Sequence, residues 1–249
     1  YYKGEHLNDI WGLTTIGIAK SQEEMDAHLA KVDQSSVGTN WGVGDIMYAD
    51  LDGDGKISNG TNKLGDTGDY RIIGNSTPRF KYGITLDAAW KGFDFSIFMQ
   101  GIGKRDLWLD GCYFWGANGQ GNEWQSTGFA EHWDFFRPEG DPLGANLNSY
   151  YPRVNFSGDR NTKVQTRYLQ NGAYLRLKNV QLGYTLPRVW TEKAGISSVR
   201  VYVSGDNLAT ITSLSKIFDP EATGSLAGTG SGKLYPLQRV ISVGVNVNF

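Results

Sequence analysis

The sequence is poor in the residues that cross-link chains or carry out catalysis. Among its 249 residues there is one cysteine, Cys112, and there are three histidines without a common spacing. A single cysteine excludes an intrachain disulfide framework, and neither a nucleophile elbow nor a metalloprotease helix is present. Glu131, His132 and Asp134 lie close in sequence, but a solvated loop explains them better than acid–base chemistry does. We therefore expect that the protein is not an enzyme.

The chain also lacks a strong net charge and a long hydrophobic segment. Its 24 Lys and Arg residues nearly balance its 26 Asp and Glu residues, and the net charge of −2 gives no reason to expect nucleic acid as a partner. No uninterrupted apolar run reaches the roughly 18 residues that a membrane helix requires. The chain starts with YYKG, without an initiator methionine or a signal peptide, so we expect it to be the inside of a longer protein.

Glycine and aromatic residues are abundant: the chain has 33 Gly, 13 Tyr, 11 Phe and 8 Trp. Aromatic residues favour strands and glycine supplies turns, so the composition predicts β structure. The clearest pattern covers residues 82–90 and 93–99, where apolar and polar residues alternate on either side of Lys91-Gly92. This alternation predicts two strands that are each buried on one face.

A two-residue turn at Lys91-Gly92 would pair Trp90 with Phe93 in a β-hairpin. The same register pairs Ala88 with Phe95, Leu86 with Ile97, and Ile84 with Met99. All of these apolar residues then share one face, without a slip in register. If this hairpin crosses a membrane, Trp90 and Phe93 lie at the interface, in an aromatic girdle.

Three more strands are expected further along the chain. Residues 168–186 form one. A change of phase near Lys178-Asn179 predicts either a β-bulge in it or a passage from the barrel rim to the membrane band. Residues 187–195 begin with proline and end with glycine, which predicts a short helical turn. Another strand covers residues 199–210, and the last strand ends the chain. The apolar residues on one face of the last strand are Ile241, Val243, Val245, Val247 and Phe249.

Residues 1–78 are rich in turn formers and contain one predicted helix. Ser21 and Glu24, three residues apart, form a capping box at its start. Apolar residues then recur at helical spacing up to residue 32. We expect a surface helix over residues 21–32 in an otherwise irregular, extracellular loop region.

Short turns and long loops alternate between the five predicted strands. The short turns are 91–92 and 187–198, and the long loops are 102–167 and 211–235. Outer-membrane barrels show this asymmetry, because their external loops are long and their periplasmic turns are short. We therefore expect barrel strands over residues 79–249, with their apolar side facing outer-membrane lipid.

Five strands are too few to close a barrel, and hydrocarbon does not tolerate an open sheet edge. Either the remaining strands belong to a longer sequence, or the membrane hypothesis is wrong. The alternative is a secreted, calcium-stabilised β-sandwich that binds carbohydrate, in which the apolar faces meet in a core. The turn and loop asymmetry, the aromatic hairpin turn and the last strand running to Phe249 favour lipid.

Five segments of the chain carry motifs that are informative as an ordered set. They are 44–55 (GDIMYADLDGDG), 69–80 (DYRIIGNSTPRF), 174–184 (YLRLKNVQLGY), 201–208 (VYVSGDNL) and 235–249 (YPLQRVISVGVNVNF). In this order and as a set, they resemble the SusC/RagA family of TonB-dependent outer-membrane transporters. The resemblance covers residues 44–249, most of the chain.

The resemblance implies an all-β fold, an antiparallel transmembrane β-barrel of about 22 strands with an N-terminal plug. This chain would be the C-terminal portion of that barrel, in the cell outer membrane. Members of the family import glycans or peptides. The resemblance implies a SusD-like surface lipoprotein as a partner, and TonB as a second partner that acts through an N-terminal part missing from this chain.

The segment DLDGDGK at residues 50–56 has the composition of a calcium loop. Carboxylates at alternate positions, with a glycine that permits a sharp turn, surround a hard cation with oxygen ligands. The twelfth position, where an EF-hand has glutamate, is Thr61, so we expect an insertion in the loop. Asp69, the first residue of the second family motif (69–80), then completes the shell, and Asp66 is the substitute candidate. The expected Ca²⁺ ligands are Asp50, Asp52, Asp54, Lys56 through its carbonyl, and Asp69. The alternative is a solvated turn without an ion.

The long loop is rich in aromatic residues, which could stack on sugar rings or pack under the lid lipoprotein. They are Trp108, Tyr113, Phe114, Trp115 and Trp124. The alternative is that these large side chains anchor the loop on the barrel rim or on one another.

Overall fold

The computed structural model describes residues 5–63, 65–121, 126, 128–223 and 235–249. The described residues form two compact units. Unit 1 contains those of Tyr1–Thr77, Asp106–Gln170 and Thr223–Lys233, and unit 2 contains those of Pro78–Arg105, Asn171–Ala222 and Leu234–Phe249. The long loop after residue 105 thus belongs to the same unit as the N-terminal region.

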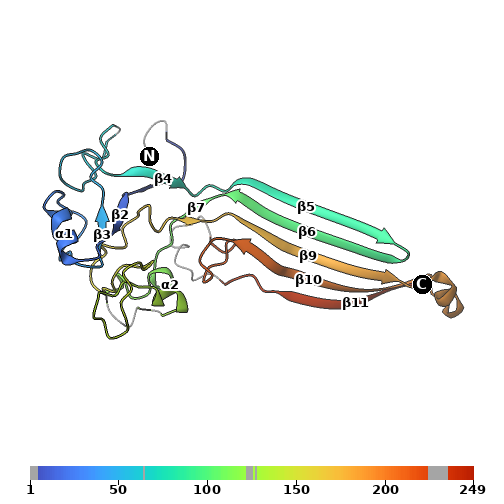
Figure 1. Ribbon diagram of the computed structural model, residues 1–249. Helices are drawn as coiled ribbons and strands as arrows, with labels where there is room; N and C mark the ends of the chain where they lie inside the picture. The colour runs from blue at the N-terminus through green and yellow to red at the C-terminus, as the bar shows by residue number, and fades with distance from the viewer. Residues whose placement is uncertain (1–4, 64, 122–125, 127, 224–234) are drawn as a thin grey trace. The chain divides into compact units, whose positions relative to one another are not determined.

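Unit 2 is one antiparallel sheet in the order β11-β10-β9-β6-β5, whose strands run side by side in Figure 1. Each predicted strand corresponds to one of these strands, which have 9 to 15 residues. A tilted strand needs roughly 9–11 residues to cross a bilayer. The strands are β5 (Arg79–Trp90), β6 (Phe93–Lys104), β9 (Tyr174–Thr185), β10 (Ser198–Thr212) and β11 (Val240–Asn248).

The hairpin of β5 and β6 has the predicted register, which begins with Trp90 opposite Phe93. Lys91 and Gly92 both have a positive φ, of 49° and 90°. Two such residues make a type I′ turn, whose twist matches that of the strands. A side chain at Gly92 would meet the carbonyl oxygen of Thr185 at 2.9 Å, so glycine is required here.

The register carries apolar residues straight across all five strands. One row consists of Trp90, Phe93, Tyr184, Val201 and Val245, and the next of Ala88, Phe95, Leu182, Val203 and Val243. A row on the opposite face consists of Asp87, Ser96, Gln181, Ser204 and Ser242. The sheet therefore has one apolar face and one polar face.

The apolar face is not covered by other described residues. Ile241 and Val243 are 71% and 77% exposed, and Phe249 is also exposed. In a β-sandwich these residues would be buried between two sheets. An exposed apolar face of this size marks a surface that meets a membrane or a partner, so the structure does not support the β-sandwich alternative.

The predicted β-bulge is confirmed at Lys178. Phe98 of β6 lies opposite Asn179, but Met99, the next residue, lies opposite Leu177. Lys178 is therefore an extra residue in β9. Because of it, Leu177 and Val180 fall on the same face although their spacing is odd.

An ion pair crosses the polar face of the sheet. Arg200 donates to the two carboxylate oxygens of Asp94 at 2.9 and 2.5 Å, and to Gln181 at 3.1 Å. The pair lies over Gly183, where a Cβ atom would come within 2.5 Å of both groups.

The predicted helical turn after β9 is also confirmed, as α3 (Arg188–Thr191) and η3 (Glu192–Ala194), followed by Gly195 in the left-handed region.

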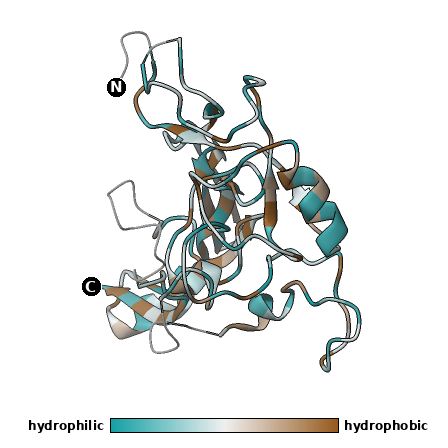
Figure 2. Cartoon of the chain, turned by 90° about the vertical axis from the view of Figure 1, so that its left-hand side faces the viewer, coloured by the Kyte–Doolittle hydropathy of each residue, from teal (hydrophilic) through white to brown (hydrophobic). Residues whose placement is uncertain are grey.

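Unit 1 is mostly irregular and contains two small antiparallel sheets. Hydrophilic and hydrophobic residues are interspersed along its loops (Figure 2). None of the helices within the described ranges is long and apolar enough to span a membrane. The sheets pair β1 (Asp9–Gly12) with β4 (Arg71–Asn75) and β2 (Thr15–Ile18) with β3 (Ile46–Tyr48). The other elements are α1 (Gln22–Leu29), α2 (Cys112–Trp115) and η2 (Ala130–Trp133), and β7 (Asp106–Leu107) pairs with β8 (Gln170–Asn171) in a further two-stranded sheet.

Helix α1 starts where predicted. The Ser21 hydroxyl accepts a hydrogen bond from the backbone N–H of Glu24, whereas the Glu24 carboxylate accepts one from the N–H of Lys20. The helix ends at Leu29, earlier than predicted. The chain then turns because Asp33 pairs with the loop at 55–57: its N–H donates to Gly55 and its carbonyl accepts from Ile57, both at 2.8 Å.

Candidate functional site

Three of the predicted calcium ligands lie together in unit 1. Carboxylate oxygens of Asp50, Asp52 and Asp69 are all within 4.8 Å of one another. Asp50 also accepts hydrogen bonds from the N–H groups of Gly53, at 2.7 Å, and Gly55, at 2.9 Å. Both glycines have a φ of +79°, which lets the chain wrap around the Asp50 carboxylate.

Asp69 is fully buried and closes the loop from the other side. It accepts hydrogen bonds from the N–H groups of Leu51, at 2.6 Å, and Ser58, at 2.8 Å. It thus holds both ends of the loop at residues 51–58. Asp66, the substitute candidate, instead closes its own turn by accepting from the N–H and the hydroxyl of Thr61.

The two remaining predicted ligands do not join the group of three carboxylates. Asp54 lies outside it and accepts a hydrogen bond from the N–H of Lys56 at 2.8 Å. Lys56 lies in the same loop, at the bridge between this loop and Asp33. The structure therefore brings together the first two carboxylates of the motif, Asp50 and Asp52, and Asp69 from the second motif.

The electrostatics of the group favour a cation. The N–H of Gly55 lowers the pKa of Asp50, so this carboxylate stays charged. The N–H of Asp54 stabilises the charged form of Asp52, but burial and the carboxylates of Asp54, Asp69 and Asp50 outweigh it and raise the pKa of Asp52. Like charges that raise a neighbour's pKa are relieved when a cation binds between them.

Two of the predicted ligand-binding aromatics are core residues. Phe114 is 0% and Trp115 3% exposed. Their ring centroids are 5.2 Å apart, and Trp115 packs edge-on against Tyr168 at 4.7 Å. Burial also raises the pKa of the Tyr168 hydroxyl. For these two residues the structure favours the alternative that the aromatics pack against one another.

The other predicted aromatics are more accessible. Trp108 and Tyr113 are partly exposed. The ring centroid of Trp108 lies 5.8 Å from that of Trp115, and the ring centroid of Tyr113 lies 5.7 Å from that of Phe129. Trp124 lies outside the described residues. Stacking of Trp108, Tyr113 or Trp124 on a ligand stays a prediction.

His132 has a structural role. Its Nδ1 accepts a hydrogen bond from the N–H of Phe129 at 3.1 Å. Its Nε2 lies 3.1 Å from the carbonyl oxygen of Phe114, so this nitrogen carries the proton and donates. Both ring nitrogens of His132 are thus used in hydrogen bonds that hold this loop.

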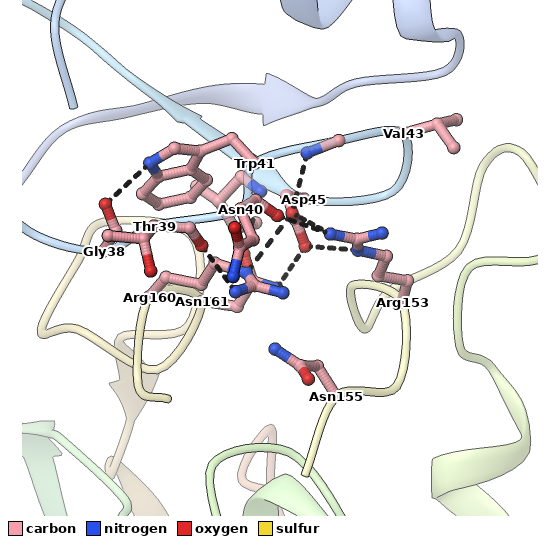
Figure 3. A network of polar contacts seen from close by, with 12 residues as sticks. Gly38, Thr39, Asn40, Trp41, Val43, Asp45, Arg153, Asn155, Arg160 and Asn161 are labelled. Carbon is pink, nitrogen blue, oxygen red and sulfur yellow. Dashed lines mark hydrogen bonds and ion pairs between the residues drawn. The ribbon is translucent and has the colours of Figure 1, made fainter. Parts of the chain in front are cut away.

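A buried ionic centre forms around Asp45, which the sequence analysis did not identify (Figure 3). The side chain of Asp45 is fully buried and accepts from Arg153 at 2.6 and 2.7 Å and from Asn161 at 2.8 Å. Arg160 lies 3.3 Å away, and the N–H of Gly42 donates at 3.0 Å. Two cations thus share one buried carboxylate.

This centre connects two segments that are far apart in the sequence. Arg160 donates to the carbonyl of Thr39 and Arg153 to that of Asn40 (Figure 3). Asn161 accepts from the N–H of Ile46 at the start of β3. The partners are more than 100 positions away from Asp45 in the chain, so no local pattern could reveal them. The centre fixes β3, which leads directly into the carboxylate loop.

We predict that Asp45→Asn destabilises unit 1 by about 3–5 kcal/mol, because it leaves the largely buried Arg160 and the partly buried Arg153 without a counter-ion. Hydrogen exchange of the intact protein should show lost protection in residues 38–48 and 153–161. The control is Asp159→Asn, which removes a mostly exposed partner of Lys163 and should change protection little. Equal protection in the two variants would contradict the role of Asp45.

Comparisons with known proteins agree with this architecture. No protein-family model matches the chain. The TonB-dependent receptor P3 of Formosa agariphila is 33% identical over 216 residues, which are 83% of this chain and 19% of that receptor. The TonB-dependent receptor P26 of the same organism is 30% identical over 256 residues, which are 99% of this chain and 23% of the receptor. The chain thus spans about a fifth of the length of these relatives.

Solved structures show a similar fold. A chain of the RagAB peptide transporter matches 97% of this chain with a TM-score of 0.63 and 24% identity, and 23% of its own length is covered. The RagAB peptide importer in its open-open state matches with the same TM-score and 23% identity. The five-stranded sheet of unit 2 is accordingly a segment of a transmembrane β-barrel, and it is open in this chain. Sequence and fold together show that the chain is a segment of a TonB-dependent transporter of the SusC/RagA type.

Proposed function

We propose that the chain contributes barrel wall and external loops to an outer-membrane transporter that imports glycans or peptides. The observation that carries this proposal is the two-faced sheet, with apolar rows on one side and Asp, Ser, Gln and Arg on the other. A barrel needs this division, because one face meets lipid and the other meets an aqueous interior. The named relatives are receptors, and we propose no catalytic role for this chain.

We further propose a SusD-like surface lipoprotein as partner of the whole transporter and TonB as its source of energy. The family resemblance and the two-part name of the RagAB neighbours support the lipoprotein. TonB would act through a part of the transporter other than this chain.

Deletion of the gene that encodes the intact protein should abolish growth on one glycan or peptide class as the sole carbon source. Loss of TonB function should have the same effect, because uptake against a gradient requires energy that the outer membrane does not supply. Growth on a monosaccharide serves as the control and should not change. A deletion strain that grows like its parent on every glycan and peptide of the panel would contradict import.

The orientation of the sheet can be tested at two adjacent residues of β11. Val243 lies in an apolar row and Ser242 in a polar row. We predict that Val243→Arg costs about 2–4 kcal/mol of folding free energy near the bilayer midplane, because it moves a charge into hydrocarbon. Ser242→Arg at the same depth should cost much less. Urea unfolding of the intact protein in lipid vesicles measures both, and equal midpoints would refute the assignment of faces.

We also propose that the loop at residues 50–69 binds Ca²⁺ through Asp50, Asp52 and Asp69. The grouping of their carboxylates supports the proposal, and Asp54 or a carbonyl of the loop could add a further oxygen. Calcium takes six to eight oxygen ligands, so water would complete the shell.

Calcium titration of the intact protein by calorimetry should show binding that Asp52→Asn weakens about tenfold or more, because one formal charge of the site is lost. Asp141→Asn, in an exposed turn elsewhere in unit 1, is the control and should bind like the wild type. Removal of calcium with a chelator should increase hydrogen exchange in residues 50–69. Absence of calcium binding by the wild-type protein would exclude the site.

A further inference from the structure

Two adjoining cavities lie entirely within unit 1. The larger has a volume of about 630 Å³ and is lined by Asn8, Trp11, Asn59, Asn62, Thr67 and Tyr70, among others. The smaller, of about 340 Å³, shares Trp11 and Thr67 with the larger one and extends to Asp52 of the carboxylate group. We call the two together the Trp11 cleft. Volumes of roughly 300–1,000 Å³ are typical of ligand pockets.

The walls of the Trp11 cleft are held in place by the fold. Trp11 lies in β1, opposite Ile72 of β4. On the facing segment, Thr67 donates through its hydroxyl to the carbonyl of Tyr70 at 2.9 Å, and Arg71 donates to the carbonyls of Gly68 and Tyr70 at 2.5 and 2.9 Å. A side chain at Gly68, whose φ is +55°, would meet the carbonyl of Ser58 at 2.3 Å. The cleft is thus formed before a ligand arrives, which lowers the entropic cost of binding.

Four charged side chains that line the cleft already make hydrogen bonds within the fold: Asp9, Asp52, Asp66 and Arg71. Asp9 accepts from the N–H of His6 at 3.0 Å and from the side-chain amide of Asn75 at 2.6 Å. Arg71 uses its Nη1 on backbone carbonyls, as described. A charged ligand would therefore compete with existing hydrogen bonds for these groups.

Neutral polar groups, in contrast, are available. Within the described part of the chain, neither the hydroxyl of Tyr70 nor the side-chain amide of Asn59 has a hydrogen-bond partner. The Asn59 amide offers a donor and an acceptor side by side, which matches two neighbouring hydroxyl groups.

We propose that the Trp11 cleft is a binding site for a neutral oligosaccharide, with the Trp11 and Tyr70 rings against the apolar faces of the sugar and Asn59 and the Tyr70 hydroxyl on its hydroxyl groups. Flat aromatic rings next to a few placed polar groups are what such a ligand requires. A peptide would present charged ends or an extended backbone, for which the free groups of the cleft are less suited. This inference rests on the proposed import function and names the cargo class for it.

The test uses the intact transporter in detergent. It is applied to an array of neutral glucans, mannans, galactans and xylans and, in parallel, to a pool of random hexapeptides. We expect retention of at least one neutral glycan. Calorimetric titration with that glycan should show that Tyr70→Phe and Asn59→Ala each weaken binding about 3- to 10-fold, since each removes one or two hydrogen bonds. Asn148→Ala, which changes an exposed asparagine of unit 1 outside the cleft, should bind like the wild type.

Both test variants leave the fold intact, because neither side-chain group bonds to a described residue. Three results overturn the proposal: no glycan of the array is retained, only hexapeptides are retained, or both variants bind the glycan with wild-type affinity. If deletion of the gene abolishes uptake while the cleft variants bind normally, transport stands and the cleft proposal fails. If deletion leaves growth on every nutrient unchanged, the proposed import itself fails, whatever the cleft binds.

Discussion

The hydrogen-bonded register of the five-stranded sheet is the constraint on which the rest of unit 2 depends. Side chains alternate between the faces, so a slip of one residue in any strand would move its apolar residues to the polar side. The type I′ turn at Lys91 and Gly92 fixes β5 on β6, and the extra residue Lys178 keeps β9 in phase with β6. Only with this register can one face meet hydrocarbon while the Asp94–Arg200 pair lies on the other.

Unit 1 has little regular secondary structure, so few of its backbone N–H and carbonyl groups find hydrogen-bond partners in strand ladders or helices. Buried carboxylates instead accept hydrogen bonds from backbone N–H groups. Asp45 binds two arginines and an asparagine and thereby joins segments more than 100 positions apart. Asp69 accepts from both ends of the loop at residues 51–58. The unit is therefore held by these polar centres together with buried apolar side chains such as Tyr48, Phe114 and Tyr168.

The same loop connects the proposed cation site and the Trp11 cleft. Asp52 belongs to the carboxylate group and also lines the smaller cavity, and Tyr70 follows Asp69 directly in the chain. Whatever fixes the position of Asp69 also fixes one wall of the cleft. A loop that is rigid for electrostatic reasons can in this way present neutral groups to a ligand in a constant geometry.

The sequence by itself determined the strands, the turn at Lys91-Gly92, the bulge at Lys178 and the helix start at Ser21, because each depends on the alternation or chemistry of neighbouring residues. It also identified Asp50, Asp52 and Asp69 as neighbours, the last through its family motif. Only the tertiary structure decided that Phe114 and Trp115 are buried, that Asp45 is an ionic centre and that Trp11 and Tyr70 line one cavity. Those contacts join distant segments, and contacts between distant segments leave no periodic signal in either one.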